Sequence, residues 1–110
     1  MISIAGTARI FFYQGVVDMR KSFEGLSQVV EEAFDEELLS GSYFAFVNRR
    51  RDRIKVLYWD VDGLAIWYKR LEKGTFSESQ IDKHPMDRKG FLMLLEGITP
   101  KKISRRYKIS

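Results

Sequence analysis

The sequence has no cysteine and only one histidine, His84, among its 110 residues. The lack of cysteine excludes disulfide bonds, thiolate metal sites and cysteine nucleophiles, and a single histidine excludes a zinc site built from several imidazoles. Glycine-rich phosphate loops of the G-x-x-x-x-G-K-[ST] and G-x-G-x-x-G types are also missing, so no pattern indicates nucleotide-dependent chemistry. These absences remove many enzyme classes, and we expect no metal and no cofactor.

Long apolar runs are also missing, since none approaches the roughly 18 to 20 residues that a membrane span requires. Residues 1–6 lack the basic start and apolar stretch of a signal peptide. We therefore expect a cytoplasmic protein with no membrane contact. The length fits one domain and not two, so we assign residues 1–98 to a single α+β domain and residues 99–110 to a mobile basic tail.

The residues that are abundant are apolar, aromatic and basic. Apolar residues make up 45% of the chain and aromatic residues 14%, which supplies the bulky side chains of a core. The net charge of +4 is unevenly distributed, because residues 1–48 hold three basic and seven acidic residues (−4) and residues 49–110 hold sixteen basic and eight acidic residues (+8). An excess of cations in one part of the chain permits binding of a polyanion such as nucleic acid.

Two helices are predicted from hydrophobic periodicity. In the first, apolar residues recur at three- and four-residue spacings over residues 19–34, and Asp18 stands at the expected N-cap. The second covers residues 88–96, with Asp87 as its N-cap and Gly97 just past its end.

Four strands are predicted from β-branched and aromatic runs, at residues 8–13, 43–47, 53–59 and 64–69. The breaks between the last three are too short for a parallel crossover, so these strands form an antiparallel meander. The predicted fold class is α+β: a single domain in which an antiparallel meander of three to five strands packs against a helix in the N-terminal half and a C-terminal helix. We expect both helices on one face of the sheet.

Alternation along the strands predicts which side chains share a face of the sheet. We expect one face to carry Phe44, Phe46, Ile54, Val56 and Tyr58, and the other to carry Tyr43, Arg53, Lys55, Trp59, Trp67 and Lys69. A two-residue turn at Asp62 and Gly63 would pair the strands one residue out of step with these faces, so a bulge or a longer loop is expected there.

Basic residues gather at one predicted hairpin and near the C-terminal end. Arginine forks match phosphate geometry, and each neutralised phosphate makes binding more dependent on salt. The candidate nucleic-acid-binding residues are Arg49, Arg50, Arg51, Arg53, Lys55, Lys69, Arg70, Lys101, Lys102, Arg105 and Arg106. The alternative is a solvated hairpin tip whose charges oppose edge-to-edge aggregation.

Aromatic residues interleave with these cations, as on surfaces that stack bases and bind phosphates. The same residue types anchor protein interfaces, and part of the aromatic face could belong to the core. The candidate partner-binding residues are Tyr43, Trp59, Trp67, Arg20 and Lys21.

Asp60 and Asp62 stand two residues apart at a predicted strand end, a spacing that could present carboxylates to Mg²⁺ in a nuclease. Aspartate before glycine is also ordinary turn chemistry, and we favour that interpretation.

Several motifs, taken together and in order, resemble one protein family. They are Asp18-Met19-Arg20-Lys21-Ser22-Phe23-Glu24-Gly25-Leu26, Arg49-Arg50, Asp52-Arg53-Ile54-Lys55, Trp59-Asp60, Gly63-Leu64, Tyr68-Lys69-Arg70-Leu71-Glu72 and Leu94-Leu95-Glu96-Gly97-Ile98. The series, over about residues 8–98, resembles the TnpB-type accessory protein (the second open reading frame) of the insertion-sequence sixty-six family of bacterial transposable elements.

The resemblance implies a bacterial cytoplasmic protein that assists transposition beside a separate transposase and a second accessory protein. No catalytic residues are established for the family, so none is carried over. Our leading hypothesis is a non-catalytic factor that helps to assemble the transposase on element-end DNA. The alternative is a protein–protein adaptor without DNA contact, and a small metal-dependent nuclease comes third. The oligomeric state is left open.

Overall fold

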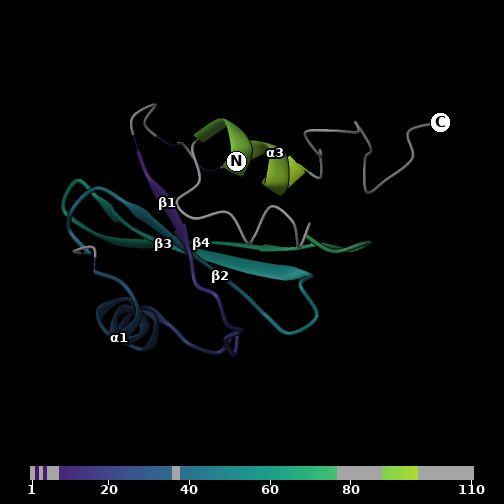
Figure 1. Cartoon of the computed structure of the whole chain (residues 1–110), viewed down its shortest axis with the longest axis horizontal. Helices are drawn as coiled ribbons and strands as arrows, with labels where there is room; N and C mark the ends of the chain where they lie inside the picture. The colour runs from purple at the N-terminus through teal and green to yellow at the C-terminus, as the bar shows by residue number, and fades with distance from the viewer. Residues whose placement is uncertain (1, 3, 5–7, 36–37, 77–87, 97–110) are drawn as a thin grey trace.

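The structure of the protein is a computed structural model, which describes residues 2, 4, 8–35, 38–76 and 88–96. Four strands form one sheet in the order β1-β2-β3-β4, and two helices pack on it (Figure 1). The elements are β1 (Ile10–Phe12), α1 (Phe23–Ala33), β2 (Tyr43–Val47), β3 (Arg53–Asp60), β4 (Gly63–Arg70) and α3 (Arg88–Glu96). The predicted α+β class and the meander of β2, β3 and β4 are confirmed.

The sheet is mixed, because β1 runs parallel to β2 while the other neighbours are antiparallel. A parallel pair needs a long crossover, and α1 occupies the segment between β1 and β2. The expectation of a wholly antiparallel sheet is therefore wrong at its first strand.

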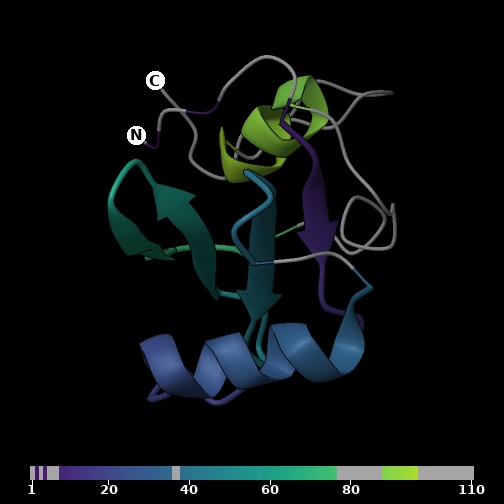
Figure 2. The same cartoon turned by 90° about the vertical axis from the view of Figure 1, so that its left-hand side faces the viewer.

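The two helices cover opposite faces of the sheet, not one face as expected. Figure 2 shows α1 running below the strands and α3 lying above them. The cluster on the α1 face contains Phe11, Val17, Leu26, Val30, Phe44, Phe46 and Leu57. The cluster on the α3 face includes Ile10, Phe12, Tyr43, Ala45, Val47, Ile54, Val56, Phe91, Leu94 and Leu95. Because both faces are buried under helices, β2 is apolar and buried throughout.

The pairing of β2 with β3 corrects the predicted faces. Phe44 pairs with Leu57 and Phe46 with Lys55, so the two phenylalanines share the α1 face with the odd-numbered residues of β3. The expected grouping of Phe44 and Phe46 with Ile54, Val56 and Tyr58 is wrong. A shift of one residue exchanges every side chain between faces, and β2, which is apolar and buried throughout, gives no polar alternation to reveal it.

The β3–β4 hairpin is closed by the pair Asp60 and Gly63, so its two turn residues are Val61 and Asp62. The turn begins one residue earlier than expected, and the register is continuous from Arg53 to Asp60 without the predicted bulge. Val61 adopts a φ of 56°, which a β-branched residue rarely takes.

The start of α1 also differs from the prediction, because its N-cap is Ser22 and not Asp18. The Asp18 carbonyl accepts a 3.0 Å hydrogen bond from the N–H of Lys21, which closes a separate turn before the helix begins. The second predicted helix is confirmed at Arg88–Glu96, while its expected caps Asp87 and Gly97 lie outside the described residues. No helix in the described part of the chain is long and apolar enough to cross a bilayer.

Candidate functional site

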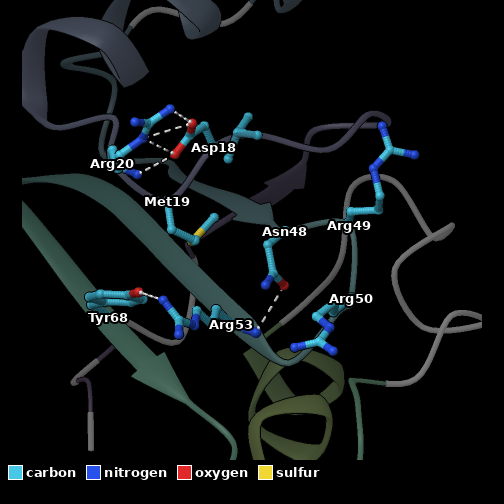
Figure 3. Close-up of a pocket in the computed structure, with 9 residues that line it drawn as sticks. Asp18, Met19, Arg20, Asn48, Arg49, Arg50, Arg53 and Tyr68 are labelled. Carbon is cyan, nitrogen blue, oxygen red and sulfur yellow. Dashed lines mark hydrogen bonds and ion pairs between the residues drawn. The ribbon is translucent and has the colours of Figure 1, made fainter.

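A hollow of about 370 Å³ opens where the segment leading into α1 meets the β2–β3 hairpin. Its lining comes from three parts of the chain that are distant in sequence: residues 17–20, residues 48–53 and Tyr68 of β4 (Figure 3). The lining residues are Val17, Asp18, Met19, Arg20, Asn48, Arg49, Arg50, Arg53 and Tyr68. The fold thus brings Arg20, a candidate partner-binding residue, together with three candidate nucleic-acid-binding arginines.

The hollow is strongly cationic. Arg20, Arg49, Arg50 and Arg53 contribute four positive charges and Asp18 one negative charge, a formal net charge of +3 (4 − 1). A guanidinium presents donors in a rigid fork that fits the oxygens of a phosphate or carboxylate. The lining is therefore suited chemically to an anion that offers several oxygens.

Asn48 holds the hairpin that carries these arginines. Its side-chain oxygen accepts hydrogen bonds from the N–H groups of Asp52 (3.1 Å) and Arg53 (3.0 Å), and its side-chain nitrogen donates to the Asp52 carboxylate (2.7 Å). Its carbonyl accepts from the N–H of Arg51 (3.0 Å), a residue with a φ of 58°. Asn48 is not among the site residues predicted from the sequence, although asparagine at the start of a turn is a signal for such hydrogen bonds.

Arg53 and Tyr68 lie on neighbouring strands on the α1 face, at the floor of the hollow. The Arg53 guanidinium donates to the Tyr68 hydroxyl at 3.4 Å, and the two side chains point toward each other in Figure 3. The Lys55 ammonium lies 4.9 Å from the centroid of the Tyr68 ring, within the range of a cation–π contact. Tyr68, 47% exposed, is thus held between two cations.

Lys55 has a second role that the sequence does not reveal. Its ammonium donates to the carbonyl oxygens of Met19 (2.6 Å) and Lys21 (2.8 Å), thirty-six and thirty-four residues away. These bonds tie the segment before α1 to the sheet, and Arg20 lies between the two carbonyls. Lys55, a candidate nucleic-acid-binding residue, therefore acts in this structure as a positioning residue for the hollow.

Asp18 is the one acidic residue of the lining. Its carboxylate accepts hydrogen bonds of 2.6 to 3.1 Å from the Arg20 guanidinium. The side-chain hydrogen bonds from Arg20, followed by the bond from its backbone N–H, lower the pKa of Asp18 from 3.8 to about 2. The same pairing raises the pKa of Arg20 above its ordinary value. Both groups are charged near neutral pH, so an incoming anion competes with Asp18 for Arg20.

Other candidate nucleic-acid-binding residues lie away from the hollow or are engaged elsewhere. Lys69 is on the α3 face, where its ammonium donates to the Leu95 carbonyl at 3.1 Å near the end of α3. Arg70 is exposed and pairs with Glu72 at 3.0 Å, which raises the pKa of Arg70. The tail candidates Lys101, Lys102, Arg105 and Arg106 lie outside the described residues.

The candidate partner-binding aromatics do not form one surface. Tyr43 is buried and stacks on Tyr58 with ring centroids 4.8 Å apart, and Trp67 packs half-buried on the α3-face cluster. Trp59 is 37% exposed and belongs to the opposite, α1 face. Lys21 is exposed beside Arg20, before α1.

Asp60 and Asp62 flank the exposed residue Val61 of the β3–β4 turn. Within the described ranges, no group of three or more histidine, aspartate or glutamate side chains is arranged to hold a metal ion.

The fold and the hollow define a small α+β protein with an arginine-lined recess. The chain belongs to the family described as IS66 Orf2 like protein, whose model matches residues 8–105. The resemblance found in the sequence is thus confirmed.

Two curated relatives come from Sinorhizobium fredii and carry the names uncharacterized protein y4jC and uncharacterized protein y4hO. They are 34% and 32% identical to this chain over 76 residues, which is 69% of the chain. The match spans 65% and 66% of the length of these relatives, somewhat under two thirds. No solved structure matches the chain.

Proposed function

We propose that this protein is a non-catalytic accessory factor of IS66-type transposition that helps to assemble the transposase on element-end DNA in the bacterial cytoplasm. Its hollow binds backbone phosphates. The observation that carries the proposal is the convergence of Arg20, Arg49, Arg50 and Arg53 around one recess with a single acidic residue in its lining. The family supports the transposition setting, and the guanidinium chemistry supports the phosphate.

The proposed contact is with the backbone and not with base edges. A helix that reads bases lies in the major groove, and the side chains that it turns toward the DNA are polar or basic. The outer side of α1 instead carries the exposed acids Glu24, Glu31 and Glu32, which phosphates repel. Binding through exposed arginines positions DNA without reading its sequence, so we expect little sequence preference from the hollow itself.

The test is a fluorescence-anisotropy titration of a labelled element-end duplex at several salt concentrations. Arg49→Ala combined with Arg50→Ala removes two exposed guanidiniums and leaves the Asn48 bonds in place. We expect affinity to fall about 30-fold, from about 1 kcal/mol per lost contact. The slope of log K against log salt should fall by about 2, because each lost phosphate contact removes about 0.9.

The matched control is Lys73→Ala combined with Lys89→Ala, which removes the same charge from exposed positions outside the hollow. We expect this control to stay within about threefold of wild type, as weak long-range attraction alone predicts. Equal loss in both double variants, or no binding by wild type at low salt, would overturn the proposal. Supercoiled plasmid should stay intact with the protein and Mg²⁺, and cleavage abolished by Asp60→Ala would favour the nuclease instead.

A second candidate function is a protein–protein adaptor for the transposase or the other accessory protein. It is favoured by two exposed apolar side chains at the β3–β4 turn. Val61 is 89% exposed, and the nearby Trp59 is 37% exposed. Exposed aromatic residues are frequent anchors of interfaces. Co-purification with the transposase that survives nuclease treatment but is lost in Trp59→Ala would support the adaptor. The DNA-binding proposal predicts that nuclease treatment abolishes co-purification.

A further inference from the structure

Among the residues that the structure describes, the outer edge of β4 is unpaired along its eight residues. In the sheet order β4 is terminal, and among the described residues only β3 pairs with it. The N–H of Leu71 donates to the carbonyl of Asp52, which makes these two residues a hydrogen-bonded pair of the antiparallel ladder. Since bonded and non-bonded pairs alternate, the backbone groups of Leu64, Ile66 and Tyr68 point away from β3.

This edge lacks two of the features that usually prevent strand addition, proline and a β-bulge, and its charged residues Lys69 and Arg70 stand only at its end. β4 has no proline, and its register with β3 runs without a bulge from Gly63 to Arg70. Its middle residues are apolar and only half-buried, from Leu64 through Trp67. A long, regular and apolar edge is a template for pairing with another strand.

We propose that β4 pairs antiparallel with β4 of a second copy of this chain, about a two-fold axis through Ile66. On the α1 face this register places Ile66 opposite Ile66 and Leu64 opposite Tyr68 of the other copy. On the α3 face it places Ala65 opposite Trp67, so that the small residue leaves room for the indole. Both sets of pairs bury apolar surface that is half-exposed in the single chain.

Charge complementarity favours this register, and it favours a second copy of this chain as the partner strand. Antiparallel pairing about Ile66 puts Arg70, at one end of β4, beside Asp62 in the turn at the other end, and symmetry makes this contact twice. Moving the axis to Trp67 would set Arg70 beside Leu64 and the two indoles against each other. Arg70 is exposed and free to leave its surface pair with Glu72, because such pairs contribute little.

The pairing has a consequence for the hollow. A two-fold axis between antiparallel strands of one sheet stands perpendicular to that sheet, so the same face of both copies lies on the same side. Arg53 and Tyr68 belong to the α1 face. The two hollows of the dimer therefore open on one side, on either flank of the axis.

Charge reversal with the full-length protein tests the inference by sedimentation velocity. Wild type should sediment as a dimer in the micromolar range. Arg70→Glu alone sets two carboxylates together at both contacts, and Asp62→Arg alone sets two guanidiniums together at both, so we expect each dimer to weaken at least tenfold. In an equimolar mixture of the two variants, the introduced glutamate of one copy meets the introduced arginine of the other. The second contact of that mixed pair keeps its original Arg70 and Asp62, so a dimer should return.

Matched charge reversal at Lys73, Lys73→Glu, should leave the dimer unchanged, because this exposed residue lies beyond the end of β4. Amide exchange supplies a second readout: the N–H groups of Leu64, Ile66 and Tyr68 should gain protection as concentration rises, while those of Ala65 and Trp67 stay protected throughout. Three outcomes would each overturn the inference. One is a wild type that stays monomeric up to about 1 mM, the weak end of measurable association. The others are a dimer that neither single charge reversal weakens, and an equimolar mixture of the two variants that remains monomeric.

Discussion

Replacing Lys55 with methionine tests whether the hollow depends on the tie between β3 and the segment before α1. Methionine keeps much of the length and apolar contact of the lysine stem but has no ammonium. The change removes the hydrogen bonds to the carbonyls of Met19 and Lys21 and the contact with the Tyr68 ring. Arg20, between the two carbonyls, should lose its fixed place in the lining.

The expected cost follows from these three contacts. We assign about 1 kcal/mol to each charge-assisted hydrogen bond, below the usual range for such bonds because one is half-buried and the other exposed. The cation–π contact adds about 0.5 kcal/mol at an exposed site. The sum of about 2.5 kcal/mol corresponds to a fall in the urea midpoint of about 1 M, with an m-value of about 2 kcal/mol/M.

The assay is urea unfolding followed by tryptophan fluorescence, with the DNA titration run on the same protein. Lys73→Met is the matched control, since it makes the same chemical change at an exposed lysine outside the sheet. A midpoint within about 0.2 M of that control, together with unchanged DNA affinity, would refute the role of Lys55. A fall in stability without a change in affinity would show that Arg20 is not held by Lys55.

Three further results are expected. Val61→Asn should raise the free energy of unfolding by about 1 kcal/mol and the Tm by about 4 °C in thermal unfolding, because it relieves a φ of 56° on a β-branched residue. Gly41→Ala should lower the free energy of unfolding by about 1 kcal/mol in urea unfolding. The cause is the φ of 91°, since no atom lies within 4 Å to clash with an added Cβ. Gly63→Ala is the control and should not lower stability, because Gly63 has equal space and no positive φ. Arg20→Gln should return the pKa of Asp18 from about 2 toward 3.8 in a carbon-13 NMR titration. Because the pKa of Asp18 is lower in the folded protein than in the unfolded chain, the pair with Arg20 stabilises the wild type above about pH 4. This stabilisation is lost as the pH falls through about 2.

Local patterns were sufficient to predict most elements of the fold. Strand residues rich in aromatic and β-branched side chains predicted β2, β3 and β4, and three- and four-residue spacings predicted both helices. The start of α1 was misplaced because Asp18 can cap either a helix or an isolated turn. The bond from the N–H of Leu26 to the Ser22 carbonyl begins the helix at Ser22, and the bond from the N–H of Lys21 to the Asp18 carbonyl closes a separate turn. The parallel placement of β1 depends on the path of the crossover, for which the sequence has no local signal.

The site was predicted only in part. The arginine hairpin was evident as a run of basic residues, and Arg49, Arg50 and Arg53 do line the hollow. Arg20 was assigned to a different surface, because nothing near residue 20 indicates that it meets residue 50. Lys55 and Lys69 look like free cations in the sequence, yet their ammonium groups bind backbone carbonyls.

The amino-acid order alone therefore accounts for the α+β class, the family and the basic character of the β2–β3 hairpin, because these depend on residue types and short spacings. The faces of the sheet, the composition of the hollow and the open edge of β4 follow from contacts between distant segments. A one-residue change in strand register exchanges the two faces while leaving every local pattern intact. The pairing of Phe46 with Lys55, and not any run of residues, puts that lysine under the turn that carries Arg20.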